Sequence, residues 1–388
     1  MRLIVDCRYV RVGRHDGISR FTAGIVAALA KRHPLVMLIS DERQLEKLPP
    51  LAWRKVSSPT SWREPFVALQ VNRLRPDVVF TPMQTMGSLG RRYRLVSTLH
   101  DLIYYSNPMP PRNLPWFVRV LWRLYHLAWW PQRLLLNGAD AVVTVSETTK
   151  RSMIEHRLTK RSITVVPNAA DTAPDGAEQG SRRQPPANRD LVYMGSFMPY
   201  KNVEVLARAL RLLPGYRLHL LSGITDADRG RYEELAPAGA LVFHDGVSDE
   251  EYDELLSRAF ALVHASRDEG FGIPLVEAMT HGTPVVVSDI PIFREIAGDA
   301  GRYFDPDDAQ GVASALRALE DDAAWLSASK SGTEQARLFD WERSAGILLE
   351  LLQRVSSGET GRVGDRVERL GSIERGNAVS DASGRESR

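Results

Sequence analysis

The segment HASRDEGFGIPLVEAMTHGTPVVVSD, at residues 264–289, predicts a strand, a loop, a helix and a second strand in close succession. The first apolar run ends near Ser266, and a glycine-bearing loop follows it. Pro274 suits the first turn of a helix, which Gly282 and Pro284 end before the next apolar run. Strands that are apolar throughout are typical of a parallel sheet buried on both faces, so this segment favours an α/β fold.

The same alternation of apolar runs and helical patterns extends along most of the chain. Predicted strands cover residues 3–7, 35–40, 77–82, 95–101, 141–146 and 163–168, and then 191–195, 217–222, 241–245, 261–266, 284–289 and 302–304. Predicted helices include 19–31, 147–156, 202–213, 250–259, 274–281 and 310–319. Two such runs predict two Rossmann-like, doubly wound domains that face each other. Ligands of such sheets bind at the carboxyl ends of the strands, so we expect the site between the domains.

Composition divides the chain into five segments. An N-terminal domain is predicted over 1–171 and a C-terminal domain over 190–340, because the intervening residues 172–189 are poor in apolar side chains and rich in Pro, Gly and charge. Residues 341–355 form a last amphipathic helix. Residues 356–388 have almost no aliphatic content, which predicts a disordered tail.

Charge is distributed unevenly, although the 388-residue chain has a formal net charge of only +2. Residues 1–180 hold 26 Lys and Arg against 14 Asp and Glu, whereas residues 181–388 hold 24 against 34. A basic first half predicts an anionic partner: a membrane surface, a phosphorylated substrate or a nucleic acid. Nucleic acid is disfavoured because the basic residues are scattered and no zinc knuckle or helix-turn-helix pattern accompanies them.

The single cysteine, Cys7, excludes a disulfide within the chain and a Cys-rich metal site. The apolar run near the N-terminus is too short for a signal peptide, and the sequence has no stretch of about 18 uncharged apolar residues. We therefore expect a cytoplasmic protein, either free or in peripheral contact with the inner face of the membrane.

The loop and helix of residues 264–289 have the chemistry of a nucleotide-sugar site. Glycines let backbone N–H groups approach a ligand closely, and a helix N-terminus favours the negative charge of a diphosphate. Glu269 and Glu277 each offer several acceptor positions, which suit the vicinal hydroxyls of a sugar or a ribose. The alternative is a generic strand–loop–helix unit with a capping glutamate. Two glutamates with GFGIPL between them and GTPVV after them are more specific than that.

These residues resemble the signature of the retaining glycosyltransferases of family 4, which have the GT-B fold. Further stretches match that family in the expected order. They are HDGISRFTAGIVAAL near the start, TLHDLIYYSNP (98–108), VVTVSETTKRSM (142–153), VVPNAAD (165–171), YMGSFMPYKNVEVLARAL (193–210) and FDWERSA (339–345). The last is similar to the family's final segment, whose helix returns to the N-terminal domain, so the resemblance covers most of the chain.

The resemblance implies donor-binding roles for most of this constellation. Glu269 would lie at the donor sugar and Glu277 at the ribose. Lys201 would stabilise the diphosphate leaving group as its negative charge develops. The other implied donor-binding residues are Gly17, Gly195, Ser196, Gly270, Phe271, Gly272, Ile273, Pro274 and Leu275.

The chain departs from the family pattern beside Lys201. Many members carry an Arg either directly after the glycine that matches Gly195 or directly before the lysine, and here Ser196 and Tyr200 stand at those positions. Lys201 is then the side-chain cation of this loop. Arg267 could compensate for the missing Arg, or it could be a solvated loop residue.

The TLHD motif places His100 at the end of a predicted strand of the first domain. It matches the family histidine near the donor sugar and the reacting centre. Asp101 would orient its imidazole or bind the acceptor. Gly17 would let the donor phosphate and the acceptor approach, and Arg20 would contact anionic groups of the acceptor or be solvated. The implied catalytic residues are His100, Lys201 and Glu269.

A metal site is not expected. The fragment DPDD at 305–308 contains an Asp-x-Asp pair, which some glycosyltransferases use to hold a metal–diphosphate complex. It precedes a predicted helix that begins near Gln310, so helix capping is the better interpretation. The resemblance likewise implies a nucleotide-sugar co-substrate, with neither a cofactor nor a metal.

Residues 112–136, RNLPWFVRVLWRLYHLAWWPQRLLL, hold half of the eight tryptophans. Arg119 and Arg123 lie one turn apart on a predicted helix that is otherwise almost entirely apolar. One interpretation is an interfacial helix, with Trp116 and Trp122 in the acyl boundary and the arginines on lipid phosphates. The other is a helix packed into the first domain or between subunits.

We therefore predict a retaining glycosyltransferase that moves a hexose from a nucleoside-diphosphate sugar to a hydroxyl acceptor in glycan or glycolipid synthesis. Within the family, HDLIYYSNP and GSFMPYKN are most similar to polysaccharide and lipopolysaccharide mannosyltransferases, which favours GDP-mannose over UDP-sugars. The alternatives are a phosphorylase or a sugar-nucleotide epimerase of the same fold, and a non-catalytic sugar-nucleotide-binding partner.

Overall fold

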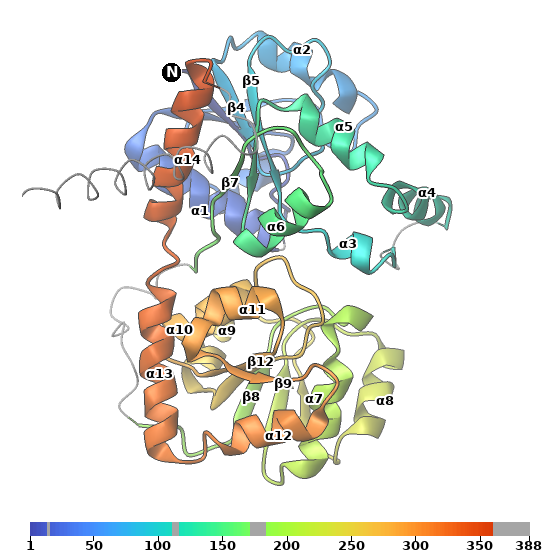
Figure 1. Ribbon diagram of the computed structural model, residues 1–388, viewed down its shortest axis with the longest axis vertical. Coiled ribbons are helices and arrows are strands. Elements are labelled where there is room, and N and C mark those ends of the chain that lie inside the picture. The colour runs from blue at the N-terminus through green and yellow to red at the C-terminus, as the bar shows by residue number, and fades with distance from the viewer. Residues whose placement is uncertain (14–15, 111–115, 171–183, 360–388) are drawn as a thin grey trace, which may run out of the picture.

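The computed structural model describes residues 1–13, 16–110, 116–170 and 184–359. Two domains are stacked along the long axis of the molecule, and the last helix reaches from the second domain to the first (Figure 1). Most of the predicted linker and the predicted tail from residue 360 lie outside the described residues.

The first domain is built on a seven-stranded parallel sheet in the order β3-β2-β1-β4-β5-β6-β7. Its strands are β1 (Leu3–Asp6), β2 (Leu35–Ile39), β3 (Trp53–Lys55), β4 (Val78–Thr81), β5 (Arg94–Leu99), β6 (Ala141–Thr144) and β7 (Ile163–Val165). Leu3 of β1 lies opposite Leu35 of β2 on one side and Val78 of β4 on the other. The strand order reverses at β1, and such switch points are where doubly wound sheets bind ligands.

The second domain has a six-stranded parallel sheet in the order β10-β9-β8-β11-β12-β13. Its strands are β8 (Asp190–Tyr193), β9 (Arg217–Leu220), β10 (Leu241–Phe243), β11 (Ala261–His264), β12 (Val285–Ser288) and β13 (Arg302–Phe304). The switch point lies between β8 and β11, because the chain leaves β8 in one direction across the sheet and returns to β11 on its other side.

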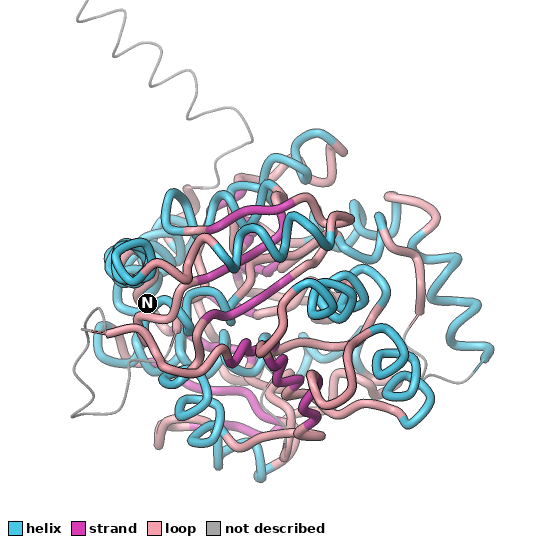
Figure 2. Tube along the Cα trace, turned by 90° about the horizontal axis from the view of Figure 1, so that it is seen from below, coloured by secondary structure: helices cyan, strands magenta, loops and turns pink. Residues whose placement is uncertain are grey.

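Helices lie on both sides of the strands (Figure 2). In the first domain they are α1 (Gly17–Arg32), α2 (Val67–Asn72), α3 (Ile103–Ser106), α4 (Trp116–His126), α5 (Trp130–Gly138) and α6 (Glu147–Glu155), with 3-10 turns at Glu42–Lys47 and Glu64–Phe66. In the second they are α7 (Val203–Ala209), α8 (Asp226–Leu235), α9 (Asp249–Arg258), α10 (Ile273–Thr280), α11 (Pro291–Ala297), α12 (Ala309–Arg317) and α13 (Asp322–Ala336), with 3-10 turns at Pro199–Lys201, Leu210–Leu212 and Gly298–Ala300. The last helix is α14 (Trp341–Ser356).

Short polar side chains start many of these helices by accepting a hydrogen bond from an otherwise unpaired backbone N–H group. They are Asp16 at α1, Ser146 at α6, Thr225 at α8, Ser248 at α9, Asp308 at α12, Asp321 at α13 and Asp340 at α14. The helices that begin after Ser146 and Asp16, α6 and α1, start on the side of the first domain that faces the second.

Helix α14 packs against α1 of the first domain. The indole of Trp341 lies over Gly24, where a Cβ atom would overlap the ring. The hydroxyl of Ser344 donates to the carbonyl of Pro167 at 2.8 Å, and Glu342 pairs with Lys31 at the end of α1. The predicted fold class is therefore confirmed, including the helix that returns to the first domain.

Five helices and one strand were not predicted: α2, α3, α8, α11, α13 and β3. The helix predicted to carry Arg119 and Arg123 is confirmed as α4, which ends at His126, and a second helix, α5, begins at Trp130. Pro131 explains the break. It has no N–H group to bond the carbonyl of Leu127, and its ring would clash with that carbonyl in a continuous helix.

Replacing Gly24 by alanine is expected to lower the free energy of unfolding by about 1–3 kcal/mol, because the added methyl group would overlap Trp341 and displace α14. Urea unfolding monitored by circular dichroism would measure the change. Gly230→Ala on α8 is the matched control, since a Cβ there meets no heavy atom within 4 Å. It should stabilise the protein by about 0.5–1 kcal/mol. Equal stability of the two variants would contradict the close packing of α14 on α1.

Candidate active site

The switch point of the second sheet brings Lys201 and Glu269 together although they are 68 positions apart. Each follows the carboxyl end of one of two neighbouring strands, β8 and β11. The Nζ atom of Lys201 donates to Oε1 of Glu269, and both side chains are mostly buried. Each charge offsets part of the cost of removing water from around the other.

A chain of hydrogen bonds connects Glu269, through Ser266 and His264, to the backbone of Met194. Nε2 of His264 lies 3.1 Å from the carbonyl oxygen of Met194, which can only accept, so this nitrogen carries a proton. Nδ1 of His264 lies 3.1 Å from Oγ of Ser266, and that hydroxyl lies 3.2 Å from Oε1 of Glu269. When His264 is neutral, the hydroxyl proton of Ser266 therefore lies between two acceptors, Nδ1 of His264 and Oε1 of Glu269.

The protonation states of this chain follow from burial and from Lys201. Burial, together with the charge of Lys201, lowers the pKa of His264 to about 4, so its ring is neutral at pH 7. Burial alone would raise the pKa of Glu269. The nearby charges and the hydrogen bonds from Lys201 and Ser266 outweigh burial and lower that pKa, so the carboxylate stays ionised. Our sequence analysis missed His264 and Ser266; the signal was a histidine and a serine at the end of a buried apolar strand.

The loop after β11 approaches the first domain too closely to admit a side chain. A Cβ atom on Gly270 would lie 2.8 Å from Cβ of Asp101 and 3.2 Å from the carbonyl oxygen of His100. Gly272 precedes α10 with φ at +94°, a conformation that glycine adopts without strain. Phe271 is buried against Phe339, with ring centroids 5.5 Å apart, so its side chain anchors the loop.

The N-terminus of α10 lies beside this loop. The helix begins at Ile273, with Pro274 in its first turn. A Cβ on Gly17, in the first domain, would lie 3.7 Å from Cδ1 of Ile273, so the loop before α1 contacts the start of α10. Leu275 is fully buried. Only the backbone of this turn could therefore meet a diphosphate, through N–H groups that a helix leaves unpaired.

The carboxylate of Glu277 receives a donor from each domain. The hydroxyl of Tyr252, on α9, donates to Oε2 at 2.8 Å. Nη1 of Arg20, on α1, donates to Oε1 at 2.6 Å, and Nη2 of the same guanidinium donates to Asp249 at 2.6 Å. Arg20, which we expected at the acceptor, is thus directed at the second domain.

His100 lies across the interface from this site. Its Nε2 is 2.8 Å from the carbonyl oxygen of Pro82, so this nitrogen carries the proton, and its ring packs edge-on against Phe21. Burial lowers the pKa of His100 to about 4. The prediction that Asp101 orients this imidazole is wrong. The carbonyl of Pro82 orients the ring, and the carboxylate of Asp101 accepts from the N–H of Ile103 at 3.1 Å.

Burial also changes the ionisation of Asp101. It raises the pKa of this carboxyl to about 6, with a further contribution from the negative charges of Glu269 and Asp268. Asp101 therefore changes charge closer to neutral pH than His100 and His264 do. Its predicted contact with an acceptor stays a prediction.

In the loop after β8, Ser196 stands where many family members carry an arginine, and its backbone is fixed by a tyrosine. The hydroxyl of Tyr193 donates to the backbone carbonyl of Ser196 at 2.7 Å, and a Cβ on Gly195 would lie 2.8 Å from that hydroxyl. Arg267 pairs with Asp307 and lies 3.3 Å from the carbonyl of Pro199. Its side chain is 45% exposed and paired with a surface carboxylate, as expected of a loop residue at the surface.

The DPDD segment caps a helix, as we predicted. Asp308 accepts from the N–H of Gln310 at 2.9 Å at the start of α12, and Asp305 accepts from the N–H of Asp307 at 2.9 Å. Across the residues that the structure describes, no group of three or more His, Cys, Asp and Glu side chains gathers as a metal would require.

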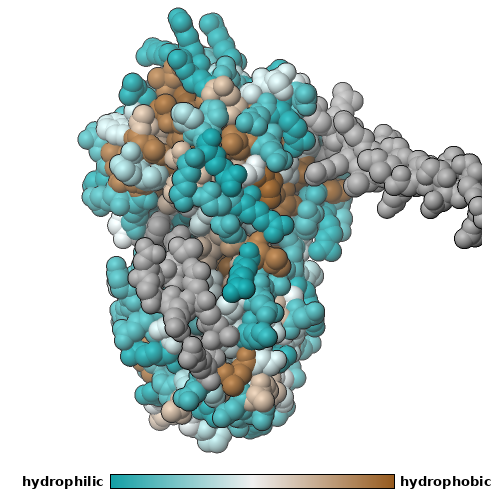
Figure 3. Space-filling view, turned by 90° about the vertical axis from the view of Figure 1, so that its left-hand side faces the viewer, coloured by the Kyte–Doolittle hydropathy of each residue, from teal (hydrophilic) through white to brown (hydrophobic). Residues whose placement is uncertain are grey.

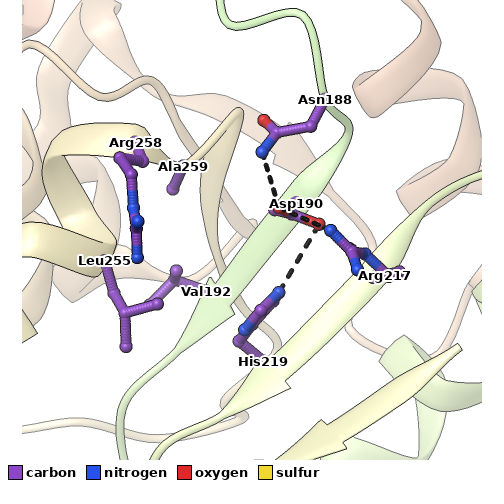
Figure 4. Close-up of a pocket in the computed structure, with 8 residues that line it drawn as sticks. All are labelled: Asn188, Asp190, Val192, Arg217, His219, Leu255, Arg258 and Ala259. Atoms are coloured by element: carbon purple, nitrogen blue, oxygen red, sulfur yellow. Dashed lines mark hydrogen bonds and ion pairs between the residues drawn. The ribbon is translucent and has the colours of Figure 1, made fainter.

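A separate pocket of about 300 Å³ opens at the other end of the second sheet (Figure 4). Asp190 and Arg217, which pair across it, are the first residues of β8 and β9. The remaining lining residues are Asn188, Val192, His219, Leu255, Arg258 and Ala259. Because this is the amino end of the strands, the pocket is distinct from the site around Lys201 and Glu269.

The tryptophan-rich segment is partly packed and partly exposed. Trp122 packs edge-on against Tyr104 of α3, with centroids 4.9 Å apart, and Trp129 stacks between Tyr105 and His156. These rings attach α4 and α5 to the first domain. Trp116 and the guanidinium-bearing Arg119 and Arg123 are exposed, as are Val120, Leu121, Leu124, Leu127, Trp130 and Leu134. Among the described helices, none combines the length and the apolar character needed to cross a membrane.

Both halves of the chain match known sequence families. Residues 15–174 match Glycosyltransferase Family 4, and residues 177–338 match Glycosyl transferases group 1. The O-antigen chain mannosyltransferase RfbU of Salmonella typhimurium is 33% identical over 290 residues, which cover 73% of this chain and 74% of the relative. O-antigen chain mannosyltransferase B of Escherichia coli is 29% identical over 270 residues, which cover 65% and 68%.

Solved structures share the fold at low sequence identity. The sucrose-phosphate synthase of Thermosynechococcus elongatus superposes with a TM-score of 0.70 at 19% identity and covers 92% of this chain and 100% of its own. Alr3699/HepE of Anabaena, in complex with UDP and glucose, has a TM-score of 0.66 at 18% identity and covers 91% and 99%. These likenesses confirm the predicted GT-B fold.

Asp101→Asn is expected to stabilise the folded protein above pH 6. In the wild type, burial disfavours the ionised carboxyl, so its pKa of about 6 in the folded state exceeds the unfolded value and the charge costs stability at neutral pH. The difference between variant and wild type should shrink as the pH falls through 6 and vanish below about 4, where both are neutral. Urea unfolding at several pH values measures it. A difference that does not change with pH would contradict the burial of an ionised Asp101.

Proposed function

The chain belongs to glycosyltransferase family 4, and from this premise we propose that it is a retaining enzyme that transfers a hexose, with mannose favoured, from a nucleoside-diphosphate sugar to a hydroxyl acceptor. The acceptor would be a growing glycan or a glycolipid. The observation that carries this proposal is the buried pair of Lys201 and Glu269 beside the N-terminus of α10.

Charge develops on the diphosphate when its bond to the anomeric carbon breaks. Lys201 and the unpaired N–H groups of α10 are fixed donors, so they would stabilise this charge more in the transition state than in the ground state. The acceptor hydroxyl would attack the anomeric carbon from the face that the diphosphate leaves, and its proton would pass to the departing phosphate oxygen. The new glycosidic bond would then keep the original configuration.

The two carboxylates would hold the donor rather than attack it. Glu269, kept ionised by Lys201, would accept hydrogen bonds from sugar hydroxyls, and Glu277 would accept from the ribose. His100 is neutral at pH 7 and its Nε2 proton is used by Pro82, so it would act as a neutral hydrogen-bonding group near the sugar.

GDP-mannose is the proposed donor. The support comes from the HDLIYYSNP and GSFMPYKN segments and from the names of the relatives, which are mannosyltransferases of O-antigen chains. Positive charge at the site comes from Lys201 and the backbone of α10, so we propose that transfer requires no metal ion.

Lys201→Ala should reduce kcat/KM for sugar transfer about 10²- to 10³-fold, because the leaving group loses a fixed positive charge. Turnover of a panel of GDP- and UDP-sugars, with and without EDTA, would measure it, and NMR of the product would give the anomeric configuration. Lys330→Ala, at an exposed position on α13, is the matched control and should match the wild type.

Several outcomes would contradict this function. The proposal fails if no sugar nucleotide binds or is turned over. Phosphate-dependent release of a sugar phosphate would instead indicate a phosphorylase, and interconversion of the donor without an acceptor would indicate an epimerase. Binding without turnover by any acceptor would favour a non-catalytic partner.

We also propose that α4 and α5 rest on an anionic membrane. Their exposed apolar residues and the exposed Arg119 and Arg123 lie at one margin of the first domain (Figure 1). The face that carries α13 and α14 is mainly hydrophilic, with smaller hydrophobic patches over the first domain (Figure 3). Burial of exposed tryptophan and leucine side chains would favour the acyl boundary, and the arginines would select phosphate headgroups. A lipid-linked acceptor would be presented on such a surface.

Charge reversal of Arg119 and Arg123 to Glu should reduce co-flotation of the protein with vesicles that contain phosphatidylglycerol, because each lost contact removes about 1 kcal/mol of attraction. Reversal of Arg73 and Arg92, two exposed arginines elsewhere in the first domain, is the matched control and should have a smaller effect. Membrane contact is excluded if the wild type does not float. Contact through α4 is excluded if both double variants float as well as each other.

A further inference from the structure

Arg20 joins the two domains through two carboxylates. It lies in the first turn of α1, and its two Nη atoms donate to Glu277 and Asp249, each at 2.6 Å. Its guanidinium also lies 6.0 Å from the ring of Tyr252, whose hydroxyl holds the other oxygen of Glu277. The side chains of Arg20 and Glu277 are 18% and 10% exposed, so this ion pair is largely shielded from water and salt. We call these four residues the Arg20 clamp.

The clamp changes the charge that a diphosphate would meet. Glu277 lies in α10, whose N-terminus is the proposed diphosphate site, and Asp249 begins the neighbouring α9. The mostly buried carboxylate of Glu277 would repel an anionic donor more strongly than a carboxylate in water does, and Asp249, which is 64% exposed, would add a weaker repulsion. Lys201 is already paired with Glu269. The first domain therefore supplies, through Arg20, positive charge that the acidic second half needs.

We propose that Arg20 is a positioning residue of the donor site, contributed by the first domain, which neutralises and orients Glu277 and thereby couples closure of the two domains to nucleotide binding. The proposal rests on the proposed function, because it takes Glu277 as the residue that binds the ribose. Coupling of this kind is reciprocal: closure favours the donor, and the donor favours closure by the same factor.

A second contact between the domains provides a matched control. The carboxylate of Glu295, on α11, accepts from the N–H groups of Glu147 and Thr148 at 2.7 Å each, at the start of α6. It joins the same two domains but does not contact Glu277. Glu295→Ala should therefore weaken the contact between the domains while Glu277 and Asp249 keep their hydrogen bonds from Arg20.

The first test uses the donor-free protein. Small-angle scattering should show a larger radius of gyration for Arg20→Ala and for Glu295→Ala than for the wild type. Calorimetric titration with GDP-mannose should then give a Kd for Arg20→Ala about ten- to a hundred-fold above the wild type, the usual effect of losing a charge-assisted hydrogen bond. Glu295→Ala should raise Kd less.

Charge rescue distinguishes positioning from a general structural role. Arg20→Ala leaves two carboxylates without their shared cation, so adding Asp249→Asn should recover part of the lost affinity. Arg20→Lys, which keeps one charge but lacks a guanidinium fork, should fall between the wild type and Arg20→Ala. A merely structural loss would not be recovered by Asp249→Asn.

The opposite sign would overturn the proposal. Tighter donor binding by Arg20→Ala would mean that Arg20 competes with the ribose for Glu277, and unchanged scattering together with unchanged Kd would mean that it does neither. If the wild type binds none of the GDP- and UDP-sugars, the proposed function itself fails. The radius of gyration then still tests whether the clamp holds the domains together. An Arg20→Ala value equal to the wild type overturns the clamp, and a larger value supports it.

Discussion

Lys201 and Glu269 form a mostly buried ion pair after the carboxyl ends of β8 and β11, and the charge of Lys201 helps to keep Glu269 ionised. This dependence extends to their neighbours. His264 is neutral because Lys201 and burial disfavour a second positive charge, and Ser266 is held between the two. On the facing domain, Asp101 is pushed towards its protonated form by burial and by the charge of Glu269. Burial is the main cause of both shifts, and the charges of Lys201 and Glu269 add to it at groups from both halves of the molecule.

The sequence was sufficient for the architecture because buried parallel strands are apolar throughout and because helix starts carry polar caps. It also placed Lys201 and Glu269 in loops after strands. It could not place them in contact, since that requires the adjacency of β8 and β11, which only the strand order provides. β3 was missed because its residues Trp53–Lys55 include two exposed basic side chains and form no apolar run. α13 was missed because small and polar residues dilute its helical pattern.

Contacts across the interface were beyond sequence reasoning for a different reason. Arg20 lies 257 positions from Glu277, and no local pattern in either segment indicates the other. The uneven charge of the two halves was a hint that we assigned only to external partners. The structure shows a second use for it: a cation of the basic half lies between Glu277 and Asp249 of the acidic half. At this contact, opposite charges from the two halves join the domains.

The last helix has a consequence for how the molecule can come apart. Because α14 follows the second domain in sequence but packs on α1, the chain connects the domains twice, once before β8 and once after α13. A single cut at the first connection would leave both pieces associated, since the C-terminal fragment would still carry the helix that covers Gly24. The first domain, expressed alone, would expose that face of α1 to water. In folding terms, the first domain gains the helix that covers α1 only after α14 has been synthesised.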